Sequence, residues 1–285
     1  MVMIKERAEN IAIRTLFREY HADYASGFFH SNYENTNEIF LCEACLSYFP
    51  LELDLQQHME TCPHRYWIPG DEIYRCAKRK CVVFEIDGRR PECAAYTRRI
   101  ARLAKLFLEE KTTLDDLHFF AFIALFEVDD YGYHFTGYFS KEWRKSVLCT
   151  NTLSCVVVLP PYRAKGYGSL LIEISYEMGR IERVPGTPER PLSATGRRVF
   201  QKMWQEEVLR AISSLHEKNL PVTINSLSSE NGMTTEDVAV ALHRLGIVFN
   251  VQQNGPLICV PRGLLRSAKK AKRIDPKSFK WVPLF

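Results

Sequence analysis

The sequence predicts an α+β protein with a small metal-binding region near its N-terminus. Three observations support this fold class. Two apolar runs, 119–128 and 134–139, flank a turn-forming stretch and predict an antiparallel hairpin. A β-branched run, 155–159, leads through two prolines into a pattern of helical period. Cysteine and histidine side chains near the N-terminus have the spacing of metal ligands.

The metal-binding prediction rests on three cysteines and one histidine. Cys42 and Cys45 are separated by two residues. His58 follows after twelve more residues, and Cys62 after a further three. Two thiolates on one turn, and an imidazole and a thiolate on one helical face, supply the four tetrahedral ligands that zinc prefers. His64 competes for the histidine position, and the alternative to a metal site is a set of buried free cysteines beside a surface histidine.

The middle of the chain is predicted from local patterns. A strand is expected to end at the turn dipeptide Asp87-Gly88. A helix is expected from about 97 to 110, and the hairpin follows with its turn at 129–132. The apolar face predicted for that helix consists of Ile100, Leu103, Phe107 and Leu108.

The run 155–159 is short, continuous and β-branched, which predicts a strand buried on both faces. After Pro160-Pro161 comes a turn, 163–169, whose two glycines let backbone N–H groups approach a ligand. The next residues predict a helix that directs free amides and a positive dipole end at a phosphate. By itself such a turn is a weak signal, because many isolated matches are ordinary loops. The predicted apolar helix face consists of Leu170, Leu171, Ile174, Met178 and Ile181.

Two further elements are expected in the C-terminal part. A helix is predicted from about 193 to 216. The segment 224–260 looks like a winged helix, with a helix capped at 234–237 that runs through Leu242 and a strand pair that turns at Asn254-Gly255. Alone, such a module suggests DNA binding.

Composition narrows the class of protein. The N-terminal ten residues carry charges where a signal peptide needs an apolar core, and the longest apolar run, 119–126, is far short of a membrane span, so a soluble protein is expected. Beyond the proposed zinc ligands, the other cysteines are expected to be reduced. The net charge of +4 is small, but the tract 266–273 is basic. That tract suits nuclear import or DNA phosphates, or is a solvated tail.

The turn region and its flanks contain a series of distinctive motifs. They are Cys155, Leu159-Pro160-Pro161-Tyr162, Gly166-Tyr167-Gly168, Ser175-Tyr176-Glu177, the run 188–193, and upstream blocks at 84–88, 103–108, 127–130 and 137–142. In these motifs the chain resembles the MYST family of histone acetyltransferases, and the resemblance extends over about residues 38 to 285. It implies an acetyl-CoA-binding N-acetyltransferase (GNAT-like) core between a C2HC zinc finger and a winged-helix-like region. In the family such a region packs beside the catalytic core, so the resemblance favours a structural role for it over DNA binding. The implied boundaries are an N-terminal segment at 1–37, the finger and first strands at 38–90, the catalytic core at 91–216 and the C-terminal part at 217–285.

The resemblance also implies roles for individual residues. Glu189 matches the general base, and Cys155 matches a cysteine read either as an acetyl-carrying nucleophile or as a packing residue. Direct attack with Glu189 as the base is the preferred reading. Lys111 matches a lysine that becomes autoacetylated, and His58 matches the finger histidine better than His64 does. The implied contacts with acetyl-CoA are Val156, Val157, Val158, Arg163, Ala164, Lys165, Gly166, Tyr167, Gly168, Ser169, Ser193 and Lys202.

Several positions depart from the family pattern. Ala164-Lys165 replaces the usual arginine pair, Ser169 replaces the usual lysine, and Ala194 replaces the aspartate after Ser193. Lys202 stands where a serine is common. The segment 74–84 is longer than the family pattern. These changes put the details of phosphate binding in question, although the glycines and the helix terminus remain.

The expected function is therefore that of a nuclear lysine acetyltransferase that uses acetyl-CoA as cosubstrate and contains a structural zinc ion. Its expected substrates are histone tails and nucleosomes, with targeting by partner subunits and DNA phosphate contacts through 266–273. No membrane partner is expected. The alternatives are an acetyltransferase for non-histone lysines and a catalytically weak chromatin-binding module.

Overall fold

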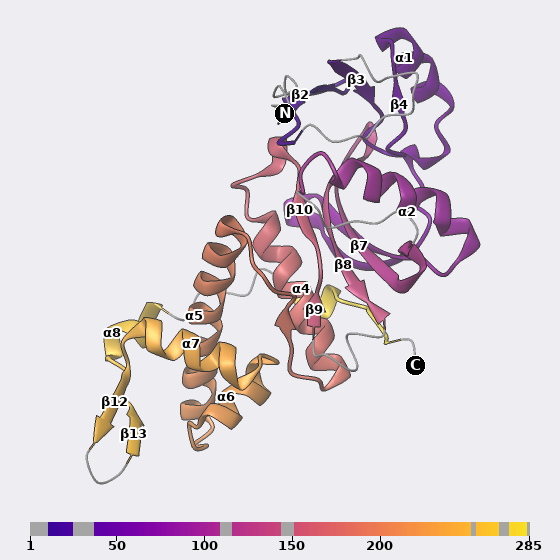
Figure 1. The fold of residues 1–285 in the computed structure, drawn as a ribbon. Coiled ribbons are helices and arrows are strands. Elements are labelled where there is room, and N and C mark those ends of the chain that lie inside the picture. The colour runs from indigo at the N-terminus through magenta and orange to yellow at the C-terminus, as the bar shows by residue number, and fades with distance from the viewer. Residues whose placement is uncertain are drawn as a thin grey trace. The chain divides into compact units, whose positions relative to one another are not determined.

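The computed structural model describes residues 11–24, 37–108, 116–143, 151–251, 255–267 and 274–283 (Figure 1). The chain divides into two compact units. Unit 1 contains Met1–Trp143, Cys155–Gly168 and Lys277–Lys280, and unit 2 contains Arg144–Ser154, Ser169–Pro276 and Trp281–Phe285. None of the helices in the described ranges has the length and hydropathy needed to cross a membrane.

Unit 1 begins with a small sheet of strand order β2-β1-β3-β4. In this sheet β1 and β3 run parallel, and the other pairs are antiparallel. Helix α1 contacts β3 and β4 and buries mainly Leu55. The elements are β1 (Ala12–Arg14), β2 (Glu19–His21), β3 (Glu38–Leu41), β4 (Tyr48–Phe49), α1 (Glu52–Thr61) and the 3-10 helix η2 (Pro63–Arg65).

The larger sheet of unit 1 has the order β10-β8-β7-β6-β5, and every neighbouring pair is antiparallel. All seven residues of β6 are buried, so this strand lies at the centre of the core. Helix α2 contacts β6. The elements are β5 (Asp71–Cys76), η3 (Ala77–Arg79), β6 (Cys81–Asp87), α2 (Pro91–Ala104), η4 (Leu117–Phe119), β7 (Phe120–Asp129), β8 (Gly132–Glu142), β10 (Val156–Val158) and η5 (Pro160–Tyr162).

The predicted hairpin and the strand that ends at Asp87 are confirmed, since Asp129 pairs with Gly132 across the turn and β6 ends at Asp87. The predicted helix 97–110 is wrong at both ends. It begins at Pro91, because proline fits the first helical turn, where its missing N–H is not needed. It ends at Ala104, where the N–H groups of Lys105 and Leu106 bond three residues back and so tighten the turn.

Strand β10 occupies one edge of the larger sheet and pairs only with β8 among the described strands. The prediction of a strand here is confirmed, but the prediction of burial on both faces is wrong. Val157 is buried, whereas Val156 and Val158 are partly exposed, as expected for a short edge strand. The pairing is close at Gly137, where a Cβ would lie 2.3 Å from the carbonyl oxygen of Val157. Only glycine fits at that position.

Unit 2 is mostly helical. Its two short sheets are the parallel pair β9 with β11 and the antiparallel pair β12 with β13. Helix α4 starts at the end of unit 1 and continues into unit 2. The elements are β9 (Asn151–Leu153), α4 (Tyr167–Glu182), β11 (Thr187–Pro188), α5 (Ala194–Glu217), α6 (Ile224–Asn231), α7 (Thr235–Leu245), β12 (Val248–Val251), β13 (Gly255–Ile258), α8 (Arg262–Ser267) and η6 (Pro276–Ser278).

Two long helices of unit 2 begin at residues whose side chains cap them. Ser193 accepts a hydrogen bond from the N–H of Gly196 and caps α5, and Thr234 does the same for α7. The apolar face predicted for α4 is buried except at Ile181, which is 39% exposed in the last turn. The strand pair predicted before residue 260 is present as β12 and β13, while Asn254 lies outside the described residues.

A charged contact joins the start of α7 to the segment after β11. Arg190 Nη2 lies 2.6 Å from Oδ1 of Asp237, whose side chain is 0% exposed. Burial raises the pKa of Asp237, although the nearby Thr187 hydroxyl and the charge of Arg190 act in the opposite direction. The guanidinium of Arg190 therefore stabilises a carboxylate that water does not reach.

We predict that Arg190→Ala destabilises the protein by about 1–3 kcal/mol at pH 7, because it leaves the buried carboxylate of Asp237 without its cation. A raised pKa in the folded state favours the protonated carboxyl, so the stability of the variant should fall as the pH rises above about 4. Denaturant unfolding at several pH values measures this. Arg197→Ala, at an exposed position on α5, is the matched control. The prediction would be contradicted if the loss of stability did not depend on pH. It would also be contradicted if the Arg190→Ala, Asp237→Asn double variant were no more stable than Arg190→Ala.

Candidate functional site

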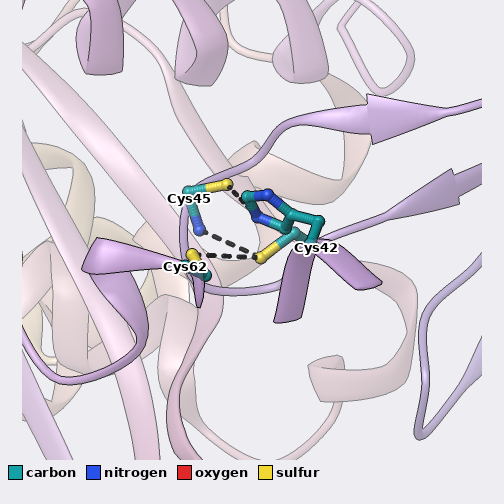
Figure 2. Close-up of side chains that lie close together, drawn as sticks. Cys42, Cys45 and Cys62 are labelled. Atoms are coloured by element: carbon teal, nitrogen blue, oxygen red, sulfur yellow. Dashed lines mark hydrogen bonds between the residues drawn. The ribbon is translucent and has the colours of Figure 1, made fainter. Parts of the chain in front are cut away.

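The four predicted metal ligands lie together in unit 1. Cys42 and Cys45 follow the end of β3, and His58 and Cys62 lie at the end of α1 and just after it. The ligand atoms of all four residues lie within 4.8 Å of one another. Figure 2 shows the sulfur atoms of the three cysteines directed toward a common point. The structure therefore brings together residues that are as much as 20 positions apart in the sequence.

The spacing of these atoms fits a tetrahedral zinc ion. Cys42 Sγ and Cys62 Sγ are 3.8 Å apart, and Cys45 Sγ is 3.2 Å from His58 Nε2. Zn–S bonds of about 2.3 Å in tetrahedral geometry place two sulfur ligands about 3.8 Å apart. Protein atoms fill all four positions, and three of the residues are buried. Such a closed site with no position for water or substrate is structural rather than catalytic.

His64, the competing histidine, has other contacts. Its Nδ1 lies 3.1 Å from the carbonyl oxygen of Trp67, and its ring stacks on the Trp67 ring at 5.5 Å. Burial lowers the pKa of His64, so the ring is neutral. It is not part of the ligand cluster.

The zinc-ligand loop is held by donors from its own backbone and from α2. The N–H of Ser47 points at Cys45 Sγ at 3.4 Å, and hydrogen bonds from Cys42 and Cys62 hold the pKa of Cys45 below its usual range. Tyr96 donates its hydroxyl to the carbonyl of Ala44 at 2.5 Å. Arg99 of α2 donates to the carbonyl of Cys45 at 3.2 Å. The finger is thereby attached to the helix that packs on the larger sheet.

A network of charged side chains, not predicted from the sequence, lies beside the finger and is centred on the buried residues His134 and Glu43. His134 Nδ1 lies 2.5 Å from Glu43 Oε2, and its Nε2 lies 2.8 Å from Asp129 Oδ1. Burial favours the neutral ring, but the two carboxylates raise the pKa of His134 above its ordinary value. Arg18 adds a second cation 3.2 Å from Glu43. Glu43 is therefore held on two sides, which fixes the loop between Cys42 and Cys45.

The predicted cofactor turn joins β10 to α4. Ala164 and Gly166 both have positive φ, 61° and 80°, so the backbone changes direction twice before the helix begins at Tyr167. Arg163 donates from Nε to the carbonyl of Val158 at 3.1 Å, which holds the turn against the end of the strand. Of the predicted cofactor residues, those from Val156 to Gly168 lie in unit 1, while Ser169, Ser193 and Lys202 lie in unit 2.

Side chains from distant segments surround this turn. Asp23 lies 2.5 Å from Arg163, and Glu127 accepts a hydrogen bond from Tyr167 at 2.7 Å. Arg79 of η3 donates to the carbonyl of Lys165 at 3.1 Å. Sequence reasoning missed these neighbours, because no local pattern reveals contacts between distant segments.

The two predicted catalytic residues lie in different units. Cys155, in unit 1, is 8% exposed, and its N–H and C=O both bond Ser140 at the start of β10. Glu189, in unit 2, is partly exposed and directly follows β11, where its N–H bonds the carbonyl of Leu153 at 2.9 Å. Leu153 precedes Cys155 by two residues in the sequence. Lys111 and most of the basic tract 266–273 lie outside the described residues.

Comparison with known protein families shows which class of protein has this combination of a zinc finger and a mixed α/β region. The MOZ/SAS family pattern matches residues 67–281, and the MYST family zinc finger domain matches residues 15–62. The chain belongs to the MYST (MOZ/SAS) family.

The relatives are similar over most of this chain. It is 35% identical over 254 residues to a "Histone acetyltransferase Tip60 homolog" of Caenorhabditis elegans, covering 86% of this chain and 54% of the relative. It is 38% identical over 260 residues to "Histone acetyltransferase of the MYST family 1" of Arabidopsis thaliana, covering 90% and 56%. It is 34% identical over 274 residues to human "Histone acetyltransferase KAT6A", covering 93% and 13%. The chain thus spans about half the length of the first two.

We predict that the purified protein carries one zinc ion and that His58→Ala loses it while His64→Ala keeps it. Removal of a direct ligand should lower zinc affinity by more than the ~10- to 100-fold typical of outer-sphere changes, and should lower the melting temperature. Metal analysis after dialysis, with thermal unfolding of both variants, measures this. Full zinc occupancy in His58→Ala would show that His58 is not a ligand. Loss of zinc from His64→Ala but not from His58→Ala would show that His64 is the fourth ligand instead.

Proposed function

We propose that this chain is a lysine acetyltransferase that transfers acetyl from acetyl-CoA to lysines of histone tails. The observation that carries the proposal is the strand, turn and helix from Val156 to Glu182, which lies within the part of the chain that matches the MOZ/SAS family. The names of the relatives support histone acetylation. The proposed location is the nucleus, and the proposed partners are nucleosomes, subunits that target the enzyme, and DNA phosphates near 266–273.

The proposed cofactor site uses the free edge of β10 and the turn that follows. Among the described strands, β10 pairs on one edge only, so backbone groups of Val156–Val158 on the other edge are suited to the amides of the pantetheine arm. The turn residues Arg163 to Gly168 and Ser169 then supply backbone N–H groups and the helix dipole for the phosphates. Ser193 and Lys202 complete the proposed contacts. The side chain of Ser193 caps α5, so its backbone is the better candidate for a cofactor contact.

The proposed reaction is direct attack by the substrate amine. A lysine ammonium has a pKa near ~10.4, so only about one in a thousand is neutral at physiological pH, and only the neutral amine attacks. We assign Glu189 as the base that takes a proton from the lysine ammonium, so that the neutral amine nitrogen can bond to the acetyl carbon. The C–S bond then breaks, and CoA leaves as a thiolate that takes up the second proton, which the nitrogen loses as the amide forms. The backbone around Glu189 is held by two contacts, its own N–H to Leu153 and the Arg190 pair with Asp237.

Cys155 is the proposed second catalytic residue only if acetyl passes through sulfur. In the preferred direct mechanism it packs beside the thioester. Its backbone is fixed by Ser140, and the described contacts with Ser140 involve its N–H and C=O rather than its sulfur.

The proposed division of the chain into domains is the one that the resemblance to the MYST family implies. We infer a GNAT-like core in residues 91–216, preceded by the N-terminal segment 1–37 and the zinc-finger region 38–90, and followed by a winged-helix-like part in 217–285. The helix pair α6 and α7 followed by the β12–β13 ribbon supports the last assignment.

We predict that Glu189→Gln lowers kcat/KM on a histone peptide by roughly 10² to 10⁴ at neutral pH. Part of the loss should return at high pH, because free lysine then supplies its own neutral amine. Glu217→Gln, at an exposed position at the end of α5, should behave as wild type. Initial rates with radiolabelled acetyl-CoA, recorded over a series of pH values, measure kcat/KM for both variants and for the wild type. Near-normal activity of Glu189→Gln across the pH range would exclude this mechanism, and an inactive wild type with bound acetyl-CoA would favour a chromatin-binding module.

We predict that Cys155→Ala lowers kcat by less than about 10-fold, because only packing of a small side chain is lost. Intact-mass spectra recorded after rapid quenching should show no acetyl-Cys155 species that forms and disappears at the rate of the overall reaction. Loss of all turnover with cofactor binding intact, together with an acetyl-Cys155 species that transfers to peptide at the turnover rate, would instead establish a covalent intermediate.

A further inference from the structure

The cations of the proposed cofactor turn are largely offset by carboxylates. Arg163 Nη2 lies 2.5 Å from Asp23, and Lys165 Nζ lies 3.8 Å from Glu127. The turn from 163 to 169 contains no other Arg or Lys. Since each cation has an anionic neighbour, the side chains of the turn offer little net positive charge to a phosphate.

Arg79 brings a further cation to the same turn. Its Nη2 donates to the carbonyl of Lys165 at 3.1 Å, and its guanidinium carbon lies 4.8 Å from the centre of the Tyr167 ring. A Cβ built on Gly166 would lie 3.8 Å from Arg79 Nη2. The guanidinium therefore lies beside the backbone of Gly166 and over the first residue of α4.

The surroundings leave most of the Arg79 guanidinium available. It has five N–H donors, and one of them bonds the carbonyl of Lys165. Within the described parts of the chain, no carboxylate oxygen lies within 4.0 Å of a guanidinium nitrogen of Arg79. The ring beneath it is fixed, because the Tyr167 hydroxyl donates to Glu127 at 2.7 Å. Arg79 is thus an oriented cation without an anionic partner.

We propose that Arg79 binds a phosphate of CoA, an inference that rests on the acetyl-CoA site proposed above. A planar guanidinium presents paired donors that match two phosphate oxygens, and its stacking on Tyr167 fixes their direction. The backbone N–H groups at the start of α4 lie beside it and favour the same ligand. The β5–β6 hairpin therefore supplies a charge that the turn itself lacks at Ala164 and Ser169.

The sequence departures described above agree with this assignment. The longer segment 74–84 forms β5, η3 and β6, and Arg79 is the last residue of η3 at the tip of this hairpin. Lys78, its neighbour, is exposed, and among the described residues no hydrogen bond or ion pair joins its side chain to the turn. Lys78 is therefore a matched control, because it carries the same charge at the same hairpin tip.

The test measures CoA binding by calorimetry with the full chain. We expect Arg79→Gln to raise the Kd of CoA about 10-fold or more, Arg79→Lys to raise it less, and Lys78→Gln to leave it unchanged. The salt dependence of binding should also become weaker in Arg79→Gln, since one charge contact with phosphate is lost. The melting temperature should stay near the wild-type value, because Arg79 is partly exposed.

A parallel titration with 3′-dephospho-CoA identifies the phosphate. If the effect of Arg79→Gln disappears with this ligand, Arg79 binds the 3′-phosphate, and if it persists, Arg79 binds the pyrophosphate. Equal Kd values for Arg79→Gln and wild type with both ligands would overturn the proposal. So would a defect in Arg79→Gln that is independent of salt and equally large in Arg79→Lys, since it indicates a structural role. A wild-type chain that binds neither ligand would refute the acetyl-CoA site itself.

Discussion

The pairing of β10 with β8 is the constraint on which the proposed cofactor site depends. Val156–Val158 pair with β8 at a point where Gly137 admits the backbone of the neighbouring strand. Ser140 holds the strand at its start, and Arg163 holds it at its end by bonding Val158. Because two prolines cannot continue the ladder, the chain leaves the sheet there and turns into α4. The position of this one short strand thus sets the position of the turn.

The zinc finger extends the same unit rather than folding as an independent module. Its ligand loop is bonded to α2 by Tyr96 and Arg99, and Glu43 within the loop is held by His134 and Arg18. A sheet of four short strands and one helix buries a small core, so a metal ion that joins β3 to α1 supplies the missing constraint. The match of the finger to residues 15–62 agrees with this extent.

Zinc binding, acetyl transfer and phosphate binding each place a different demand on the structure. The zinc site requires only that four ligands converge, and the structure brings them within 4.8 Å. Acetyl transfer requires a base and a bound thioester, and the candidate residues are held by their backbones, Glu189 through Leu153 and Cys155 through Ser140. Phosphate binding requires net positive charge, and the pairing of Arg163 and Lys165 with carboxylates shifts that task toward Arg79.

The features that could be predicted from the sequence are those that depend on residues close together in the chain. Cysteine and histidine spacing indicated the four ligands of the zinc site, turn residues indicated the β7–β8 hairpin, and the cap at 234–237 indicated the start of α7. That β10 lies at a sheet edge follows only from the tertiary structure, whereas the start of α2 at Pro91 has a local cause that the sequence analysis missed. The tertiary structure also decided which charges meet at the turn, since Arg79 and Lys165 are 86 residues apart, and Arg163 and Asp23 are 140 apart. Periodicity and capping act over a few residues, whereas strand order and ion pairing depend on how distant segments pack.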